Sequence, residues 1–290
     1  MKKLIFLFVL VVFTKLNAQL NVTSDLKFDT PIYLAENHWI VLPPKESDKN
    51  FLSGFVYFDN AAGYTLEIGD DFEVKNNFFS VIPNPIKQKG SMKMRIKNMM
   101  LKVAVLSDDR IKQMSLNKIP DWLQNYQTND SQNEKAFKRA SFLNGSGFSL
   151  LALEKLNKLY NADYRTSKLY FEVIFGFNAL RKYDDAYKFA QEAAKNNFTD
   201  DLILKESVYA LVNMKKNAEV EEFFNKNLKK FTNENFKSES LLNYILSLYS
   251  SKDIENTKKW LNVYQSEIKN VPPAHKKYID QIQNEINNKK

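Results

Sequence analysis

The chain has 290 residues, of which 44% are hydrophobic, and its formal net charge is +8. It contains no cysteine, which excludes disulfides, thiol catalysis and cysteine-bound metals. Its basic residues alternate with acidic ones instead of gathering in one stripe among aromatics, so the sequence does not predict nucleic-acid binding. A chain of this length is expected to form roughly two compact units.

The first segment has the pattern of a secretory signal peptide. Two lysines precede the apolar run at residues 4–13, and Ala18 is a small residue suited to the cleavage site. Residues 1–18 are therefore predicted to be a signal peptide. Because Leu16 is not a typical residue before such a site, a retained anchor is the alternative. No other stretch is apolar enough to cross a membrane, so no stable span is expected after cleavage.

Residues 19–126 are predicted to be a β domain, because apolar residues there alternate with polar ones. Met92, Met94 and Ile96, for example, alternate with basic residues, which predicts a half-buried strand with these three side chains on its buried face. Candidate strands lie at residues 31–35, 39–42, 55–58, 64–68, 78–82, 92–96 and 101–106. Strands this short, with a five-residue hairpin loop at residues 59–63, predict a small antiparallel sandwich or barrel. A short helix is expected at residues 120–126, and the polar run 127–132 is the expected linker.

The rest of the chain has a helical period with a longer repeat of 34 residues above it. Shifts of 34 residues align three sets of apolar positions: Ala140, Ile174, Val208 and Leu242; Leu143, Phe177, Leu211 and Ile245; and Ala152, Ala186, Val220 and Ile254. A repeat of this length, built from two helices, predicts about four helical hairpins over residues 133–269.

This segment resembles the tetratricopeptide (TPR) family. The best unit is residues 167–200, where large and small side chains occupy the family's packing positions: Tyr170, Val173, Phe177, Ala186, Ala190 and Ala193. Ile174 and Phe198 depart from the family pattern, and Lys258 stands at a packing position of the fourth unit. An irregular helical-hairpin array of another kind is the alternative.

Residues 270–290, which open with two prolines, are predicted to form a polar helix that caps the array. The expected fold class is therefore α+β with two domains: a small antiparallel β sandwich or barrel, followed by an all-α TPR-like superhelix.

Residues suited to catalysis are few. The two histidines, His38 and His275, fall in different predicted domains, and no cysteine is present to complete a zinc site. Paired acids such as Asp184 and Asp185 open predicted helices, where they cap backbone N–H groups. Nucleophile and phosphate-binding motifs are missing. We therefore expect no enzyme activity, no metal and no cofactor.

The resemblance implies that ligands lie in a groove formed by the first helix of each hairpin. The first-helix residues not needed for packing are Phe137, Lys168, Phe171, Phe175, Asn178, Lys205, Tyr209, Asn213 and Asn243. Aromatic faces bury apolar side chains, asparagine amides pair with a peptide backbone, and lysine pairs with carboxylates.

The expected function is that of an exported scaffold or adaptor, periplasmic, cell-surface or extracellular, that binds a protein or peptide. Carbohydrate or small-ligand binding by the β domain is the alternative, because Trp39, Tyr57 and Tyr64 could stack on a sugar. Binding in the groove is favoured, since it rests on a repeated set of side chains and the alternative rests on three aromatics.

The N-terminal pattern generates the first prediction. The native protein is expected to be exported and cleaved after Ala18, because the charged, apolar and small-residue regions follow in the order that signal peptidases require. Intact mass or N-terminal sequencing of the native protein measures this. A mature chain that still begins at Met1 in a cytoplasmic fraction would contradict it.

Overall fold

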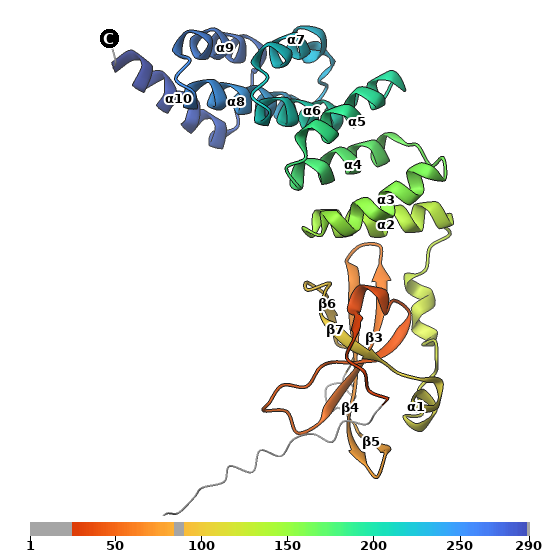
Figure 1. Cartoon of the computed structure of the whole chain (residues 1–290). Helices are drawn as coiled ribbons and strands as arrows, with labels where there is room; N and C mark the ends of the chain where they lie inside the picture. Colours follow the sequence, from red (N-terminus) through yellow and green to blue (C-terminus); the bar gives the residue numbers. More distant parts are fainter. Residues whose placement is uncertain (1–24, 84–89, 289–290) are drawn as a thin grey trace, which may run out of the picture. The chain divides into compact units, whose positions relative to one another are not determined.

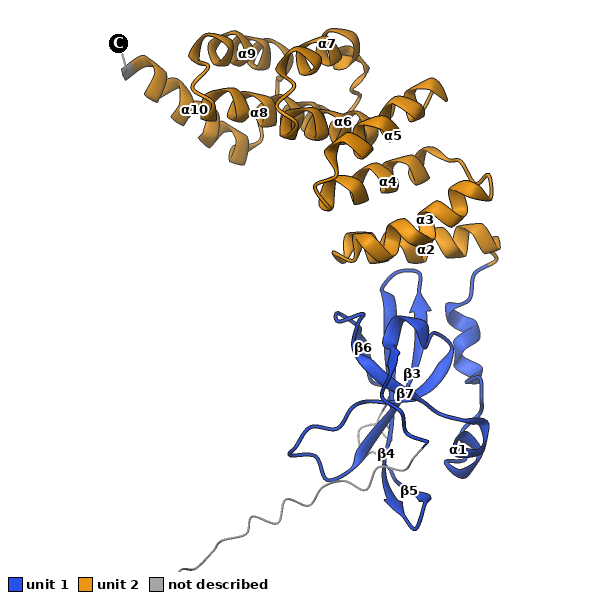
Figure 2. Cartoon of the chain, in the orientation of Figure 1, with its two compact units in different colours: residues 1–128 blue, residues 129–290 orange. Residues whose placement is uncertain are grey.

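The computed structural model describes residues 25–83 and 90–288. The predicted signal peptide, residues 1–18, lies outside these ranges. The chain divides into two compact units, residues 1–128 and residues 129–290 (Figure 2). The first unit carries an antiparallel sheet and the second is helical (Figure 1), which confirms the α+β class with two domains.

The described strands of the first unit form one antiparallel sheet with the order β1-β7-β2-β3-β4-β5, and β6 also pairs with β4. The strands are β1 (Thr30–Pro31), β2 (His38–Val41), β3 (Phe51–Asp59), β4 (Gly63–Lys75), β5 (Phe78–Ile82), β6 (Lys93–Arg95) and β7 (Lys102–Val105). The path of pairing does not close between β1 and β5. The described strands therefore form a single open sheet.

Aromatic side chains fill the core of this unit. Trp122, in the 3-10 helix η3 (Asp121–Tyr126), meets the rings of Phe55 and Tyr57 edge-on at centroid distances of 5.7 and 5.1 Å. The short helix α1 (Asp108–Gln113) is fixed by Arg110, whose guanidinium bonds to Asp25 at 2.7 Å. Aromatic pairs of this geometry add to the stability gained by burying their surface.

Three local predictions for this unit were wrong. Residues 31–35 contain the 3-10 helix η1 (Ile32–Leu34) in place of a strand, and Pro31 fixes the extended backbone that precedes it. The long hairpin turns over three residues, 60–62, instead of five. Met94 is 48% exposed, because β6 lies at the edge of the sheet and contributes only Ile96, just beyond its end, to the interior.

The second unit consists of helical hairpins. Its helices are α2 (Gln132–Gly145), α3 (Ser149–Asn161), α4 (Ser167–Ala179), α5 (Tyr183–Lys195), α6 (Asp201–Asn213), α7 (Asn217–Asn227), α8 (Glu234–Ser250), α9 (Ile254–Glu267) and α10 (Pro273–Asn288). The 3-10 turn η4 (Leu228–Lys230) follows α7. The first helix of each hairpin (α2, α4, α6 or α8) is called a first helix, and the other a second helix. Consecutive first helices contact one another, and α8 also contacts α10.

The 34-residue period is visible in the turns as well as in the packing. The turns that follow α2, α4 and α6 each contain one residue with left-handed backbone. These residues are Gly147, Arg181 and Lys215, with φ of 86°, 58° and 58°. Ala152, Ala186 and Val220, at equivalent positions of the second helices, are all fully buried. The first three hairpins therefore repeat in backbone conformation and in side-chain packing.

The fourth hairpin departs from the period because α8 has 17 residues whereas α6 has 13. Its left-handed residue is Lys252, with φ of 63°, three positions later than the period predicts. The predicted alignment of Ile254 with Ala186 was therefore wrong, and Thr257, which is fully buried, occupies that position. The same shift places buried Leu261, not exposed Lys258, in the core.

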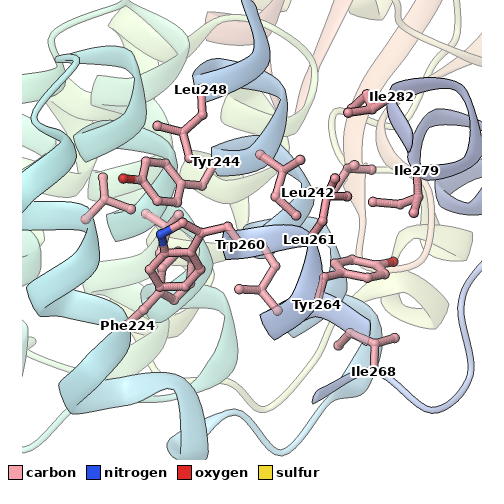
Figure 3. Close-up of a cluster of buried hydrophobic side chains, with 14 of the residues drawn as sticks. Phe224, Leu242, Tyr244, Leu248, Trp260, Leu261, Tyr264, Ile268, Ile279 and Ile282 are labelled. Carbon is pink, nitrogen blue, oxygen red and sulfur yellow. The ribbon is translucent and has the colours of Figure 1, made fainter. Parts of the chain in front are cut away.

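The C-terminal end of the array has the largest described core of the second unit (Figure 3). Trp260 lies 5.1 Å from the ring of Phe224 and 5.2 Å from that of Tyr244, which joins α9 to α7 and α8. From α10, Ile279 and Ile282 enter the same cluster. The last helix is thus amphipathic, because one face is apolar and covers the end of the core.

The packing of the second helices generates a prediction. Replacement of Ala186 by leucine adds three carbon atoms at a fully buried position, and such overpacking lowers the free energy of unfolding by roughly 1–3 kcal/mol. Thermal or urea unfolding of Ala186→Leu measures the loss. Ala194→Leu, at an exposed position of the same helix, is the matched control and should change stability little. Equal stability of the two variants would contradict the assigned packing.

Candidate functional site

The exposed face of α4, α6 and α8 carries two neighbouring hollows, which we call the first and the second hollow. The first has a volume of ≈ 270 Å³ and is lined by Phe175, Asn178, Ala179, Lys205, Glu206, Tyr209, Glu239 and Asn243. The second has a volume of ≈ 330 Å³ and is lined by Tyr209, Val212, Asn213, Lys215, Asn243, Leu246, Ser247 and Ser250. Tyr209 and Asn243 line both, so the two hollows adjoin, and we call them together the groove.

The aromatic residues of the predicted set lie on this row of helices. The rings of Phe171 and Phe175 are 6.0 Å apart on α4, and both are partly buried. Tyr209 is 39% exposed and its ring lies 6.2 Å from that of Tyr183. Phe137 is further along the row, on α2, and is not among the residues that line either hollow. Phe175 and Tyr209 therefore give the first hollow its apolar surface.

Asn178 has a structural role in the first hollow. Its Nδ2 donates to the backbone oxygen of Glu206 at 3.0 Å and to Oε2 of the same residue at 2.9 Å. The side chain is only 4% exposed. Its amide hydrogens are thus engaged between α4 and α6, and they are not free to fix the backbone of a ligand.

The same pair occurs one repeat earlier. Asn144 on α2 donates from Nδ2 to the backbone oxygen and to Oε2 of Glu172 on α4, both at 2.8 Å. Ser141 donates to the other oxygen of this carboxylate at 2.5 Å. Burial raises the pKa of the Glu172 carboxyl above its ordinary value of 4.5, although these donors act in the opposite direction. We call the two pairs the Asn–Glu bridges.

Lys205 is held by two carboxylates. Its Nζ lies 3.3 Å from Oε1 of Glu206 and 3.4 Å from Oε1 of Glu239. Burial alone would lower the pKa of Lys205, but the two glutamates outweigh this effect and raise it. Lys205 therefore remains charged, and its charge is already balanced within the protein.

The remaining predicted residues differ in how freely they face solvent. Asn243 lines both hollows and is partly exposed. Asn213 is exposed, and its Nδ2 donates to the backbone oxygen of Tyr209 at 2.8 Å. Lys168 is exposed at the start of α4, away from the residues that line the hollows. Asn243 is therefore the predicted amide best placed to contact a ligand.

The acidic residues that line the first hollow, Glu206 and Glu239, were not predicted from the sequence. Glu206 lies 34 residues after Glu172, and Asn178 lies 34 residues after Asn144, so the bridge residues follow the repeat period. This spacing was the available signal for Glu206, whereas Glu239 aligns with Lys205 and carries no such signal. A search for apolar periodicity does not find it, because buried asparagine and glutamate are uncommon.

The aromatic residues that suggested sugar stacking on the β domain are buried. Trp39 is 5% exposed and donates from Nε1 to the backbone oxygen of Asn117 at 2.8 Å. Tyr57 and Tyr64 are 0% and 2% exposed. None of the three offers an open ring face to a ligand.

The described part of the chain has neither a cluster of metal ligands nor a helix suited to cross a membrane. No group of three or more potential metal ligands occurs in residues 25–83 and 90–288. Within the same ranges, none of the helices combines the length and the apolar character that a bilayer crossing requires. His275, on α10, bonds through Nδ1 to the buried hydroxyl of Ser238 at 2.7 Å, which is a packing role.

Comparison with protein-family models, curated proteins and solved structures finds no match for this chain.

The buried carboxyl of Glu172 generates a prediction about pH. Because its pKa is raised on folding, the folded chain binds more protons than the unfolded chain between the unfolded and folded pKa values. The contribution of Glu172 to stability should therefore fall as pH rises through that window. Glu172→Gln removes the titration; its amide oxygen can still accept from Nδ2 of Asn144, and its amide nitrogen can donate to the hydroxyl of Ser141.

Urea unfolding of the wild type and of Glu172→Gln at a series of pH values from about 4 upward measures this difference, the lower limit being set by the ordinary range of a glutamate pKa. As pH rises, the free energy of unfolding of the wild type relative to the variant should fall, and it should become constant above the pKa of Glu172 in the folded state. Glu154→Gln, at an exposed position of α3, is the control. A difference that does not change with pH would contradict the prediction.

Proposed function

We propose that this chain is an exported, non-catalytic scaffold or adaptor that binds a protein or peptide partner in the groove of its TPR-like repeats. The observation that carries the proposal is the adjoining pair of hollows on α4, α6 and α8. They combine partly exposed aromatic rings with amide and charged groups, and this mixture suits the side chains and backbone of a polypeptide.

The repeat architecture supports this proposal. Three consecutive hairpins share their turn conformation and their buried positions, and the last helix covers the end of the core. In repeat arrays, each unit contacts only its neighbours and the stack presents an extended surface that binds partners. The 34-residue period and the small residues at Ala186, Ala190 and Ala193 favour the TPR kind among such arrays.

No observation favours the alternative, carbohydrate or small-ligand binding by the β domain. The aromatics that suggested it, Trp39, Tyr57 and Tyr64, are buried. Stacking of a sugar on any of these three rings would require the core of the sheet to open.

The groove generates a prediction for binding. Phe175→Ala and Tyr209→Ala each remove an aromatic side chain from the first hollow. Truncation of such an anchor weakens binding by on the order of 2 kcal/mol, or about thirtyfold in affinity. Pull-down from envelope extracts with each variant, followed by quantitative mass spectrometry, identifies partners whose recovery depends on the groove.

The matched controls are Lys229→Ala and Lys230→Ala, at exposed positions of η4 outside both hollows. They should recover the same partner as the wild type. Melting curves must be recorded in parallel, because loss of a packed ring could lower binding by unfolding the hairpin. Folded groove variants that recover every partner as the wild type does would overturn the proposal.

A further inference from the structure

The ionised side chains that line the first hollow have an excess of negative charge. Glu206 and Glu239 contribute two carboxylates, and Lys205 contributes one ammonium group. The side chain of Glu239 is 42% exposed, whereas that of Glu206 is 8% exposed. The carboxylate open to solvent is therefore that of Glu239.

The charge of Lys205 is already paired within the protein. Lys205 lies between Glu206 and Glu239, at 3.3 and 3.4 Å, and its side chain is 20% exposed. A ligand carboxylate that approached it would meet two carboxylates of the protein, and like charges at such distances repel. A ligand cation would meet an excess of negative charge. The expectation that Lys205 receives a carboxylate is therefore not favoured.

The second oxygen of Glu239 is the polar atom best placed for a ligand cation. Within the described part of the chain, the bonds of this carboxylate all go to Lys205 and involve Oε1 alone. The rings of Phe175 and Tyr209 line the same hollow. Aromatic faces attract lysine and arginine heads and bury their aliphatic stems.

On these grounds, and resting on the proposed function of the groove, we infer that the first hollow receives a basic side chain of the partner, lysine or arginine. Its charged head pairs with Glu239, and its stem packs against Phe175 and Tyr209. The occupant is thus a polypeptide segment with a positive charge at the anchoring position.

The test uses a phage-displayed library of random dodecapeptides, selected on the full-length protein and in parallel on Glu239→Gln. Wild-type selections should be enriched in peptides with a shared lysine or arginine. For one such peptide, replacement of arginine by citrulline, its neutral analogue, should weaken binding roughly fivefold, which is the upper range for a partly exposed ion pair. Binding to Glu239→Gln should fall by a similar factor.

A charge exchange separates direct pairing from a structural role. Glu239→Lys should bind the peptide in which glutamate replaces arginine better than it binds the original peptide, and loss of packing alone would not reverse this preference. Glu154→Gln, at an exposed position of α3, should bind like the wild type. Melting curves of all variants are to be recorded as the control for folding.

The outcomes distinguish the inference from the proposed function. Selected peptides that bind the groove but carry acidic or no shared charged residues would overturn the inference and leave the proposed function intact. Peptides whose binding is equal on the wild type, Phe175→Ala and Tyr209→Ala would overturn both. So would a selection that enriches no peptide.

Discussion

The contact between successive first helices is the constraint on which the groove depends, and at two junctions it is made by the Asn–Glu bridges. Asn144 and Asn178 each donate from Nδ2 to the backbone and to the carboxylate of a glutamate on the next first helix. Burial of a carboxylate is unfavourable unless donors satisfy it. Because each bridge bonds a backbone oxygen as well, it fixes the axial register of two helices and thereby sets which side chains meet on the exposed face.

The bridges also determine the charge of that face. Asn178 holds Oε2 of Glu206, and Oε1 of the same carboxylate is left to pair with Lys205. Lys205 then reaches Glu239, at the equivalent position of the next repeat. A single chain of polar contacts thus runs from α4 through α6 to α8. The electrostatic character of the first hollow is a consequence of how the helices are joined.

The sequence predicted the repeat, because buried positions recur every 34 residues, but it could not predict where the period breaks. Compared with the period, α8 begins one residue earlier and ends three residues later. The left-handed residue of the last hairpin, Lys252, therefore lies three positions later than a shift of 34 residues from Lys215 predicts. The misplaced Lys258 was the visible sign of this shift. In the β unit, Met94 was expected in the core because alternation alone cannot distinguish an edge strand from a central one. Of the predicted aromatic residues, Phe175 and Tyr209 line the first hollow, as does the predicted Lys205. The glutamates that pair with Lys205 were not predicted, because side-chain pairing is not determined by the repeat register.

The groove changes character where the bridges end. Val212 stands 34 residues after Asn178, so the junction of α6 with α8 lacks the amide that forms a bridge. Val212 and Leu246 instead line the second hollow, both partly exposed. The two hollows share Tyr209 and Asn243 but differ in charge, because the first is lined by two glutamates and one lysine and the second carries Lys215 among uncharged residues. Under the proposed function, a polypeptide that lies in both hollows would therefore place a basic residue at the first hollow and an uncharged residue at the second. This order, more than the affinity of either hollow alone, would give the groove its selectivity among partners.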